Sequence, residues 1–185
     1  MNPPNTSREE IMRVSRKIVS ERGLPALNMR TLAKECGIAL GTLYNYYSDK
    51  DELVVAAIES VWQDILEKSA PDSGVSFSQY VTQTYAHIID RLKDYPDFLA
   101  AHSISVAGSV KGKARGMMER CFGKIRSELH EVLLNDPNVD RSVFSDIFCE
   151  ENLIEHVLDN IVILIIKGKR DCATLTEILD RLLYR

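Results

Sequence analysis

The sequence lacks the closely spaced cysteines of disulfide-rich or zinc-binding proteins and the long apolar runs of membrane-spanning ones. Its four cysteines, at positions 36, 121, 149 and 172, never show the C-x-x-C spacing of a zinc site. Its unbroken apolar runs, such as Ile161–Ile166, are far shorter than a membrane span. Met1–Ser7 is polar and contains prolines, unlike a secretory signal. We therefore expect reduced, mostly buried thiols and a cytoplasmic protein with no membrane partner.

Patterns of catalytic residues are missing as well. The sequence has no glycine-rich phosphate loop, no metal-ligand spacing and no nucleophile–base motif. Its four histidines are scattered along the chain. We therefore expect neither an enzyme nor a bound metal or cofactor.

The composition is that of an ordinary globular protein, with 45% hydrophobic and 27% charged residues in a chain of 185. This length allows one domain or two small ones. The net charge of −4 argues against a protein that coats nucleic acid or an anionic membrane. Residues 1–50 hold eight Lys and Arg against five Asp and Glu, a net +3, which leaves −7 for the rest. This asymmetry is consistent with different partners for the two parts, and a chance distribution of charges is the alternative.

Apolar residues recur with the helical period almost from end to end, which predicts an all-α fold of about nine helices. The run Ile161–Ile166 alone would also suit a buried strand, but its continuity with Leu153–Leu158 favours a helix. The first predicted helix contains Ile11 to Ile18 and stops at Gly23, and the second extends from its cap Asn28 to Gly37. A third lies near 40–47, and a long fourth begins at Asp49. The remaining helices are predicted near 76–93, 97–107, 111–134, 142–167 and 173–184. Asp49 and Glu52 form a predicted capping box.

The second and third helices are joined by Gly37–Ala39, a tight turn that is typical of a helix-turn-helix. Many helical hairpins have such turns without binding DNA, so a plain three-helix subdomain stays open at this point. On a helix over residues 40–47, one side holds Leu40, Leu43, Tyr44 and Tyr47, and the other holds Gly41, Thr42, Asn45 and Tyr46. The second side is polar and uncharged, which suits base edges and phosphate oxygens.

Residues 37–53, GIALGTLYNYYSDKDEL, resemble the signature of the TetR family of bacterial transcriptional regulators. The shared features are the Gly–Thr–Leu–Tyr core, the following aromatics, and the lysine and acid that lead to Leu53. The preceding segments Glu21–Gly23 and Asn28–Ala33 fit as well. The resemblance covers residues 11 to about 58, and the remainder shares only helical character and length with the family.

The resemblance implies a DNA-binding domain over residues 1–53 and a helical regulatory and dimerisation domain over 54–185. Together with the uncharged helix face, it predicts that the DNA-binding residues are Arg30, Thr31, Leu40, Gly41, Thr42, Tyr44, Asn45, Tyr46 and Lys50. Leu43 and Tyr47 match core positions. The helical wheel places Tyr44 inside, whereas the resemblance places it at a phosphate.

Three residues depart from the family's pattern, and the first of them, Val19, stands where the first helix often has phenylalanine. Ala39 stands where a capping serine is common, so about 1 kcal/mol of capping is missing. Leu40 stands where a polar base-contacting residue is common, and its side chain suits a thymine methyl group instead.

The last helices are predicted to form a dimer interface, because the end of the helix near 142–167 is apolar all round and must be covered. A two-fold four-helix bundle would achieve this, although burial within the chain is the alternative. The predicted interface residues are Val157, Ile161, Leu164, Ile165, Leu175, Ile178, Leu179 and Leu182.

The family usually binds a small-molecule inducer in its second domain. The candidate lining residues are Trp62, Tyr80, Tyr85, Phe98, His102, Met117, Met118 and Phe122, a mixture that fits a pocket and equally an ordinary core.

The resulting hypothesis is a DNA-binding transcriptional repressor that binds a palindromic operator as a homodimer and is released by a small-molecule effector. The alternative is a small-molecule-binding or thiol-sensing helical dimer that does not regulate genes. In that case, Cys121 or Cys149 would be the first candidates for the sensor.

Overall fold

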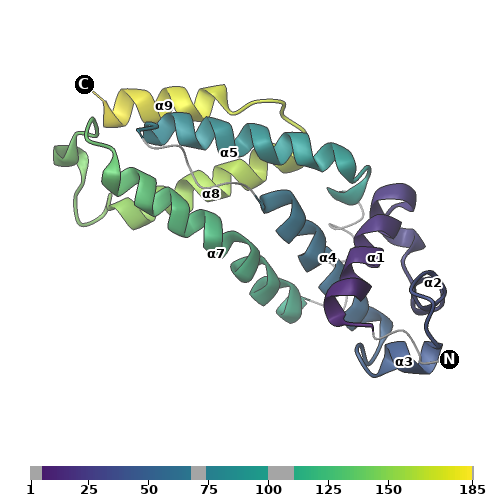
Figure 1. The fold of residues 1–185 in the computed structure, drawn as a ribbon. Coiled ribbons are helices and arrows are strands. Elements are labelled where there is room, and N and C mark those ends of the chain that lie inside the picture. The colour runs from purple at the N-terminus through teal and green to yellow at the C-terminus, as the bar shows by residue number, and fades with distance from the viewer. Residues whose placement is uncertain (1–5, 68–73, 100–110, 185) are drawn as a thin grey trace. The chain divides into compact units, whose positions relative to one another are not determined.

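The computed structural model describes residues 6–67, 74–99 and 111–184, and every regular element within these ranges is helical (Figure 1). The predicted all-α fold is therefore confirmed. The elements are α1 (Arg8–Arg22), η1 (Leu24–Ala26), α2 (Met29–Glu35), α3 (Leu40–Tyr44), α4 (Lys50–Leu66), α5 (Phe77–Arg91), η2 (Leu92–Asp94), α7 (Lys111–Asn135), η3 (Arg141–Val143), α8 (Glu150–Ile166) and α9 (Ala173–Leu183).

Three helix predictions differ from the structure or fall outside it. The helix expected over 142–167 begins only at Glu150, because Ser145 and Phe148 close the preceding loop with reciprocal hydrogen bonds of 2.9 and 3.1 Å. The helix expected near 40–47 ends at Tyr44. The one expected near 97–107 lies mostly outside the described residues. The apolar run 161–166 is helical, as predicted.

The chain divides into two compact units, the first with residues 1–65 and 91–121, the second with 66–90 and 122–185. Helix α4 is unbroken across residue 53. The predicted domain boundary at that residue therefore stays a prediction.

The helix ends of the first unit follow from single residues. Gly23 ends α1 with φ 77° and donates its N–H to the Val19 carbonyl. Asn28 begins α2 by accepting the Thr31 N–H on its side chain at 3.0 Å. Gly37 ends α2 with φ 67°, which glycine adopts at little cost. These three predicted helix boundaries are confirmed.

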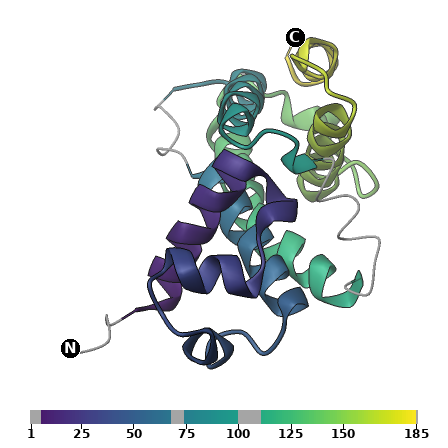
Figure 2. The ribbon, with the colours of Figure 1, turned by 90° about the vertical axis from the view of Figure 1, so that its right-hand side faces the viewer.

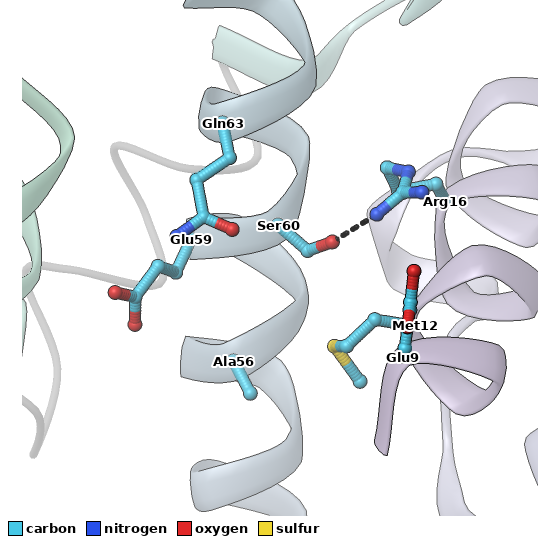
Figure 3. Close-up of a pocket in the computed structure, with 7 residues that line it drawn as sticks. All are labelled: Glu9, Met12, Arg16, Ala56, Glu59, Ser60 and Gln63. Atoms are coloured by element: carbon cyan, nitrogen blue, oxygen red, sulfur yellow. Dashed lines mark hydrogen bonds between the residues drawn. The ribbon is translucent and has the colours of Figure 1, made fainter. Parts of the chain in front are cut away.

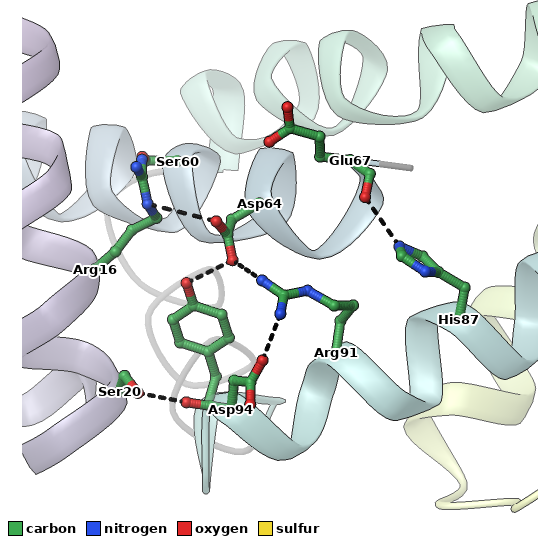
Figure 4. Close-up of polar contacts among 9 residues, drawn as sticks. Arg16, Ser20, Ser60, Asp64, Glu67, His87, Arg91 and Asp94 are labelled. Carbon is green, nitrogen blue, oxygen red and sulfur yellow. Dashed lines mark hydrogen bonds and ion pairs between the residues drawn. The ribbon is translucent and has the colours of Figure 1, made fainter. Parts of the chain in front are cut away.

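Asp64 on α4 connects three segments of the first unit (Figure 4). Its carboxylate accepts hydrogen bonds from Arg91 at 2.6 Å and from the Tyr95 hydroxyl at 2.8 Å. Arg16 on α1 lies 3.8 Å from the same carboxylate and donates to Ser60 at 2.5 Å. One carboxylate thereby holds α1, α4 and the segment after α5 together.

The second unit contains most of α5, the larger part of α7, and α8 and α9, and Figure 2 shows α5, α8 and α9 nearly end-on. The buried side chain of Asp136 connects three of its segments. It accepts the Phe77 N–H at 2.9 Å, the Tyr184 hydroxyl at 2.7 Å and the Asn138 N–H at 3.0 Å. Burial alone would raise the pKa of Asp136, but these hydrogen bonds outweigh it and lower the pKa.

We predict that Asp136→Asn lowers the free energy of unfolding by about 1–3 kcal/mol at neutral pH, because its NH2 group would face buried donors. Since the folded-state pKa of Asp136 is lowered, the stabilisation is complete above the ordinary aspartate pKa of about 3.9. It is lost as the pH falls through the folded-state value. Urea unfolding at several pH values measures both effects. Exposed Asp146 is the control, and an equal loss in Asp146→Asn would contradict the prediction.

Candidate nucleic-acid interface

Helix α3 is short and is anchored by two buried side chains. It packs against α2, and Leu43 and Tyr47 are almost completely buried. Ala39 precedes α3 in an extended conformation and provides no side-chain cap, as predicted. The Ile38 N–H bonds to the Ala33 carbonyl at 3.0 Å, which fixes the turn between the two helices. The geometry is that of a helix-turn-helix.

The outer face of α3 is polar, uncharged and accessible. Gly41, Thr42, Tyr44 and Asn45 are exposed, and Leu40 is half-buried. Tyr44 is 49% exposed, so the inward position from the wheel is wrong, while its contact with a phosphate stays a prediction. Within the described part of the chain, no hydrogen bond involves the side chains of Thr42, Tyr44 or Asn45. These groups are therefore available to an external partner.

Tyr46 differs from the other outer residues because its hydroxyl has a partner within the chain. The side chain is half-buried, and the hydroxyl donates to the Thr6 carbonyl at 2.6 Å. Next to it, the Arg8 guanidinium lies 5.1 Å from the ring centroid of Tyr47. The residues that precede and begin α1 are thus attached to the end of α3. No sequence signal pointed to this contact, because the two segments lie far apart in the chain.

Cations lie at the starts of the helices on both sides of α3 in the sequence. Arg30 is exposed and Thr31 half-buried in the first turn of α2, and Lys50 is exposed at the start of α4. Asp49 accepts the Glu52 N–H at 2.7 Å, as the predicted capping box requires. Glu52 accepts the N–H of Ser48 rather than that of Asp49, also at 2.7 Å, and this bond is the main cause of its lowered pKa.

The predicted ligand-lining residues fall into both compact units. Trp62, Phe98 and Met117 are buried in the first, where the rings of Trp62 and Phe98 lie 5.7 Å apart edge to face. Tyr80, Tyr85 and Phe122 are buried in the second. His102 and the side chain of Met118 lie outside the described residues. Their assembly into one ligand site stays a prediction.

A separate open pocket lies between α1 and α4 in the first unit (Figure 3). Its lining residues are Glu9, Met12, Arg16, Ala56, Glu59, Ser60 and Gln63. Three of its polar residues already have partners, because Arg16 donates to Ser60 and Arg120 donates to Glu59 at 2.7 Å. No pattern in the sequence indicated this pocket.

Most of the predicted dimer-interface residues are buried within the single chain. These are Val157, Ile161, Ile165, Leu175 and Leu179. Leu164 is half-buried, while Ile178 and Leu182 on α9 are exposed. Ile163 and Ile166 on α8 are also exposed, at 46% and 66%, and were not among the predicted interface residues. The sequence did contain a signal for them, because two isoleucines three residues apart lie on the same face of a helix.

Cys121 is a poor thiol sensor. Its side chain is buried, and burial raises the pKa of the thiol to about 11. Because the thiolate is the reactive form, little of it exists at neutral pH. Cys149 is half-buried. Within residues 6–67, 74–99 and 111–184, no cluster of His, Cys, Asp and Glu could hold a metal ion, and no helix is long and apolar enough to cross a membrane.

The geometry of α2, α3 and the turn between them is that of a helix-turn-helix DNA-binding domain. A comparison with known protein families identifies which kind of helix-turn-helix domain it is. Residues 11–57 match the model of the bacterial regulatory proteins of the tetR family. This match places a tetR-type DNA-binding domain in residues 11–57, where the sequence signature implied it.

The curated relatives are transcriptional regulators. An uncharacterized HTH-type transcriptional regulator of Haemophilus influenzae is 33% identical over 95 residues, which cover 50% of this chain and 50% of the relative. The HTH-type transcriptional regulator UidR of Escherichia coli is 30% identical over 79 residues, which cover 42% of this chain and 40% of UidR. The chain therefore spans about half, or less, of the length of these relatives.

Two solved structures share the fold. BioQ, solved with its double-stranded DNA operator, has a TM-score of 0.61 and 16% identity, and the match covers 89% of this chain and 88% of BioQ. The multidrug binding protein EbrR, solved with proflavin, has a TM-score of 0.61 and 14% identity, with 95% and 98% covered. At these identities, the likeness shows the fold alone.

We predict that removing the hydroxyl of Tyr46 lowers the stability of the protein, whereas removing that of Tyr44 does not. Tyr46→Phe removes the hydrogen bond to Thr6 and should lower the free energy of unfolding by about 0.5–1.5 kcal/mol. Tyr44→Phe removes an exposed hydroxyl and should change it by less than about 0.5 kcal/mol. Urea unfolding of the two variants tests this difference. Equal stability of the two variants would show that the bond to Thr6 contributes nothing.

Proposed function

We propose that this chain is a sequence-specific DNA-binding transcriptional regulator. The observation that carries the proposal is the exposed, uncharged outer face of α3 in a tetR-type helix-turn-helix. In such a motif, the second helix enters the major groove and presents its outer side chains to base edges. The predicted domain division, with DNA binding in residues 1–53 and regulation in 54–185, belongs to this proposal.

DNA affinity and DNA specificity come from different residues in this proposal. Thr42, Tyr44 and Asn45 offer neutral hydrogen-bonding groups to bases and phosphates. Lys50 and Arg30 neutralise phosphates, and Lys50 is assisted by the positive end of the long helix α4. The overall charge of −4 then limits binding to DNA of unrelated sequence.

The regulator acts as a homodimer on a palindromic operator. A recognition helix of five residues offers too few contacts for specificity, whereas two copies read two half-sites about one helical turn apart. The exposed side chains of Ile163 and Ile166 on α8, and of Ile178 and Leu182 on α9, supply an apolar surface for the partner subunit.

The mode of regulation is repression that a small-molecule effector relieves. This part of the proposal is supported by the family's usual behaviour and by fold likeness to EbrR, a multidrug binding protein solved with proflavin. The buried aromatic residues Trp62, Phe98, Tyr80 and Tyr85 are the candidates for contacts with the effector.

We predict that Lys50→Ala weakens binding to DNA from the gene's own upstream region and reduces its dependence on salt. The loss of one phosphate contact in each subunit should make the slope of log K against log salt about two units less negative for a dimer. Fluorescence anisotropy over a salt series measures this, with exposed Lys124→Ala on α7 as the control. Equal binding of upstream and scrambled DNA by the wild type would overturn the proposed function.

We predict that Ile178→Glu and Ile163→Glu convert the dimer to a monomer, because a buried charge would oppose association. Ile147→Glu is the matched control, since Ile147 is 86% exposed in the loop before α8 and lies outside the proposed interface. Sedimentation velocity measures the oligomeric state. A dimer that persists in both interface variants, or that is lost in Ile147→Glu, would contradict the proposed interface.

A further inference from the structure

The absence of cations on α3 restricts the base pairs that it can read. No Lys or Arg occurs from Cys36 to Ser48. Guanine is read most commonly by Arg or Lys, which donate two hydrogen bonds to its O6 and N7 atoms. The flanking cations Arg30 and Lys50 belong to the first turns of α2 and α4. The outer face of α3 itself therefore lacks the usual groups for guanine.

The groups that α3 does expose suit A·T pairs. Leu40 is half-exposed at the first position of the helix, and Thr42 is exposed two residues later with its methyl and hydroxyl groups. Aliphatic groups of this kind contact the C5-methyl group of thymine, which cytosine and both purines lack. The exposed amide of Asn45 suits the N6 and N7 atoms of adenine.

Gly41 lies between Leu40 and Thr42, and the fold does not require a glycine at this position. Its φ angle is not positive, and an added Cβ would find no atom within 4 Å. Glycine weakens a helix relative to alanine, so the fold alone would favour alanine at this position. The missing side chain leaves the backbone of α3 uncovered on its outer face, where another molecule can approach closely.

We propose that α3 selects A·T pairs by their thymine methyl groups. Leu40 and Thr42 make the apolar contact, and Gly41 allows the helix backbone to come close enough for it. This inference rests on the proposed function, because it identifies the base pairs that the DNA-binding face recognises.

The test uses the full chain and a duplex that it selects from a randomised library. Each thymine of the selected site is replaced in turn by deoxyuridine, which loses only the C5-methyl group and pairs as before. Binding should weaken roughly fourfold for each contacted methyl, the factor expected from exposing one buried methyl group. Thymines outside the selected site serve as controls and should show no change.

Three variants assign the effect to residues. Thr42→Ser keeps the hydroxyl and removes one methyl at an exposed position, so it should fold normally. Replacing thymine by deoxyuridine should then weaken its DNA binding less than it weakens that of the wild type. Leu40→Ala should reduce the effect of deoxyuridine in the same way, with its folding checked by circular dichroism. Gly41→Ala should raise the thermal midpoint while it weakens DNA binding, a combination that a purely structural glycine would not produce.

The outcomes separate this inference from the proposed function. Equal binding of thymine and deoxyuridine duplexes at every position of the selected site would overturn methyl readout and leave the DNA-binding regulator intact. A full deoxyuridine effect in both Thr42→Ser and Leu40→Ala would overturn the assignment to these residues. Failure to select any duplex over scrambled DNA would overturn the proposed function itself.

Discussion

The exposed outer face of α3 depends on the burial of Leu43 and Tyr47, because α3 has only five residues. A helix of this length is not stable alone in water, since the first turn costs more conformational entropy than its hydrogen bonds return. Ala39 adds no side-chain cap at its start. Packing against α2 and the turn at Gly37 therefore hold the helix, and the outer side chains of Thr42, Tyr44 and Asn45 make no hydrogen bond within the described part of the chain.

The three tyrosines between positions 44 and 47 show how one short segment divides its side chains. Tyr47 is buried and anchors the helix, while the hydroxyl of Tyr46, just after α3, donates to the carbonyl of Thr6, just before α1. Tyr44 alone presents an accessible hydroxyl. The aromatic, uncharged segment thus combines a packed ring, a bonded hydroxyl and an exposed hydroxyl, while Arg30 and Lys50 provide charge from the neighbouring helices.

Buried or half-buried carboxylates organise both compact units. Asp64 joins α1, α4 and the segment around Tyr95, and Asp136 joins the start of α5 to the ends of α7 and α9. In each case, several donors converge on one side chain, so that the loss of a single carboxylate would leave several groups unpaired. Neither role was predicted, since hydrogen-bond partners tens of residues apart leave no periodic signal in the sequence.

The sequence by itself determined the helical class, the caps at Asn28, Gly37 and Asp49, and the tetR-type motif, because these depend on local geometry and short-range periodicity. Tertiary structure decided the rest. Packing ended α3 at Tyr44 and left the Tyr44 side chain exposed. The helical wheel had placed this side chain inside. Packing also buried Val157 and Ile161 within the chain and left Ile163 and Ile166 exposed, because burial depends on which helices pack together rather than on hydrophobicity alone.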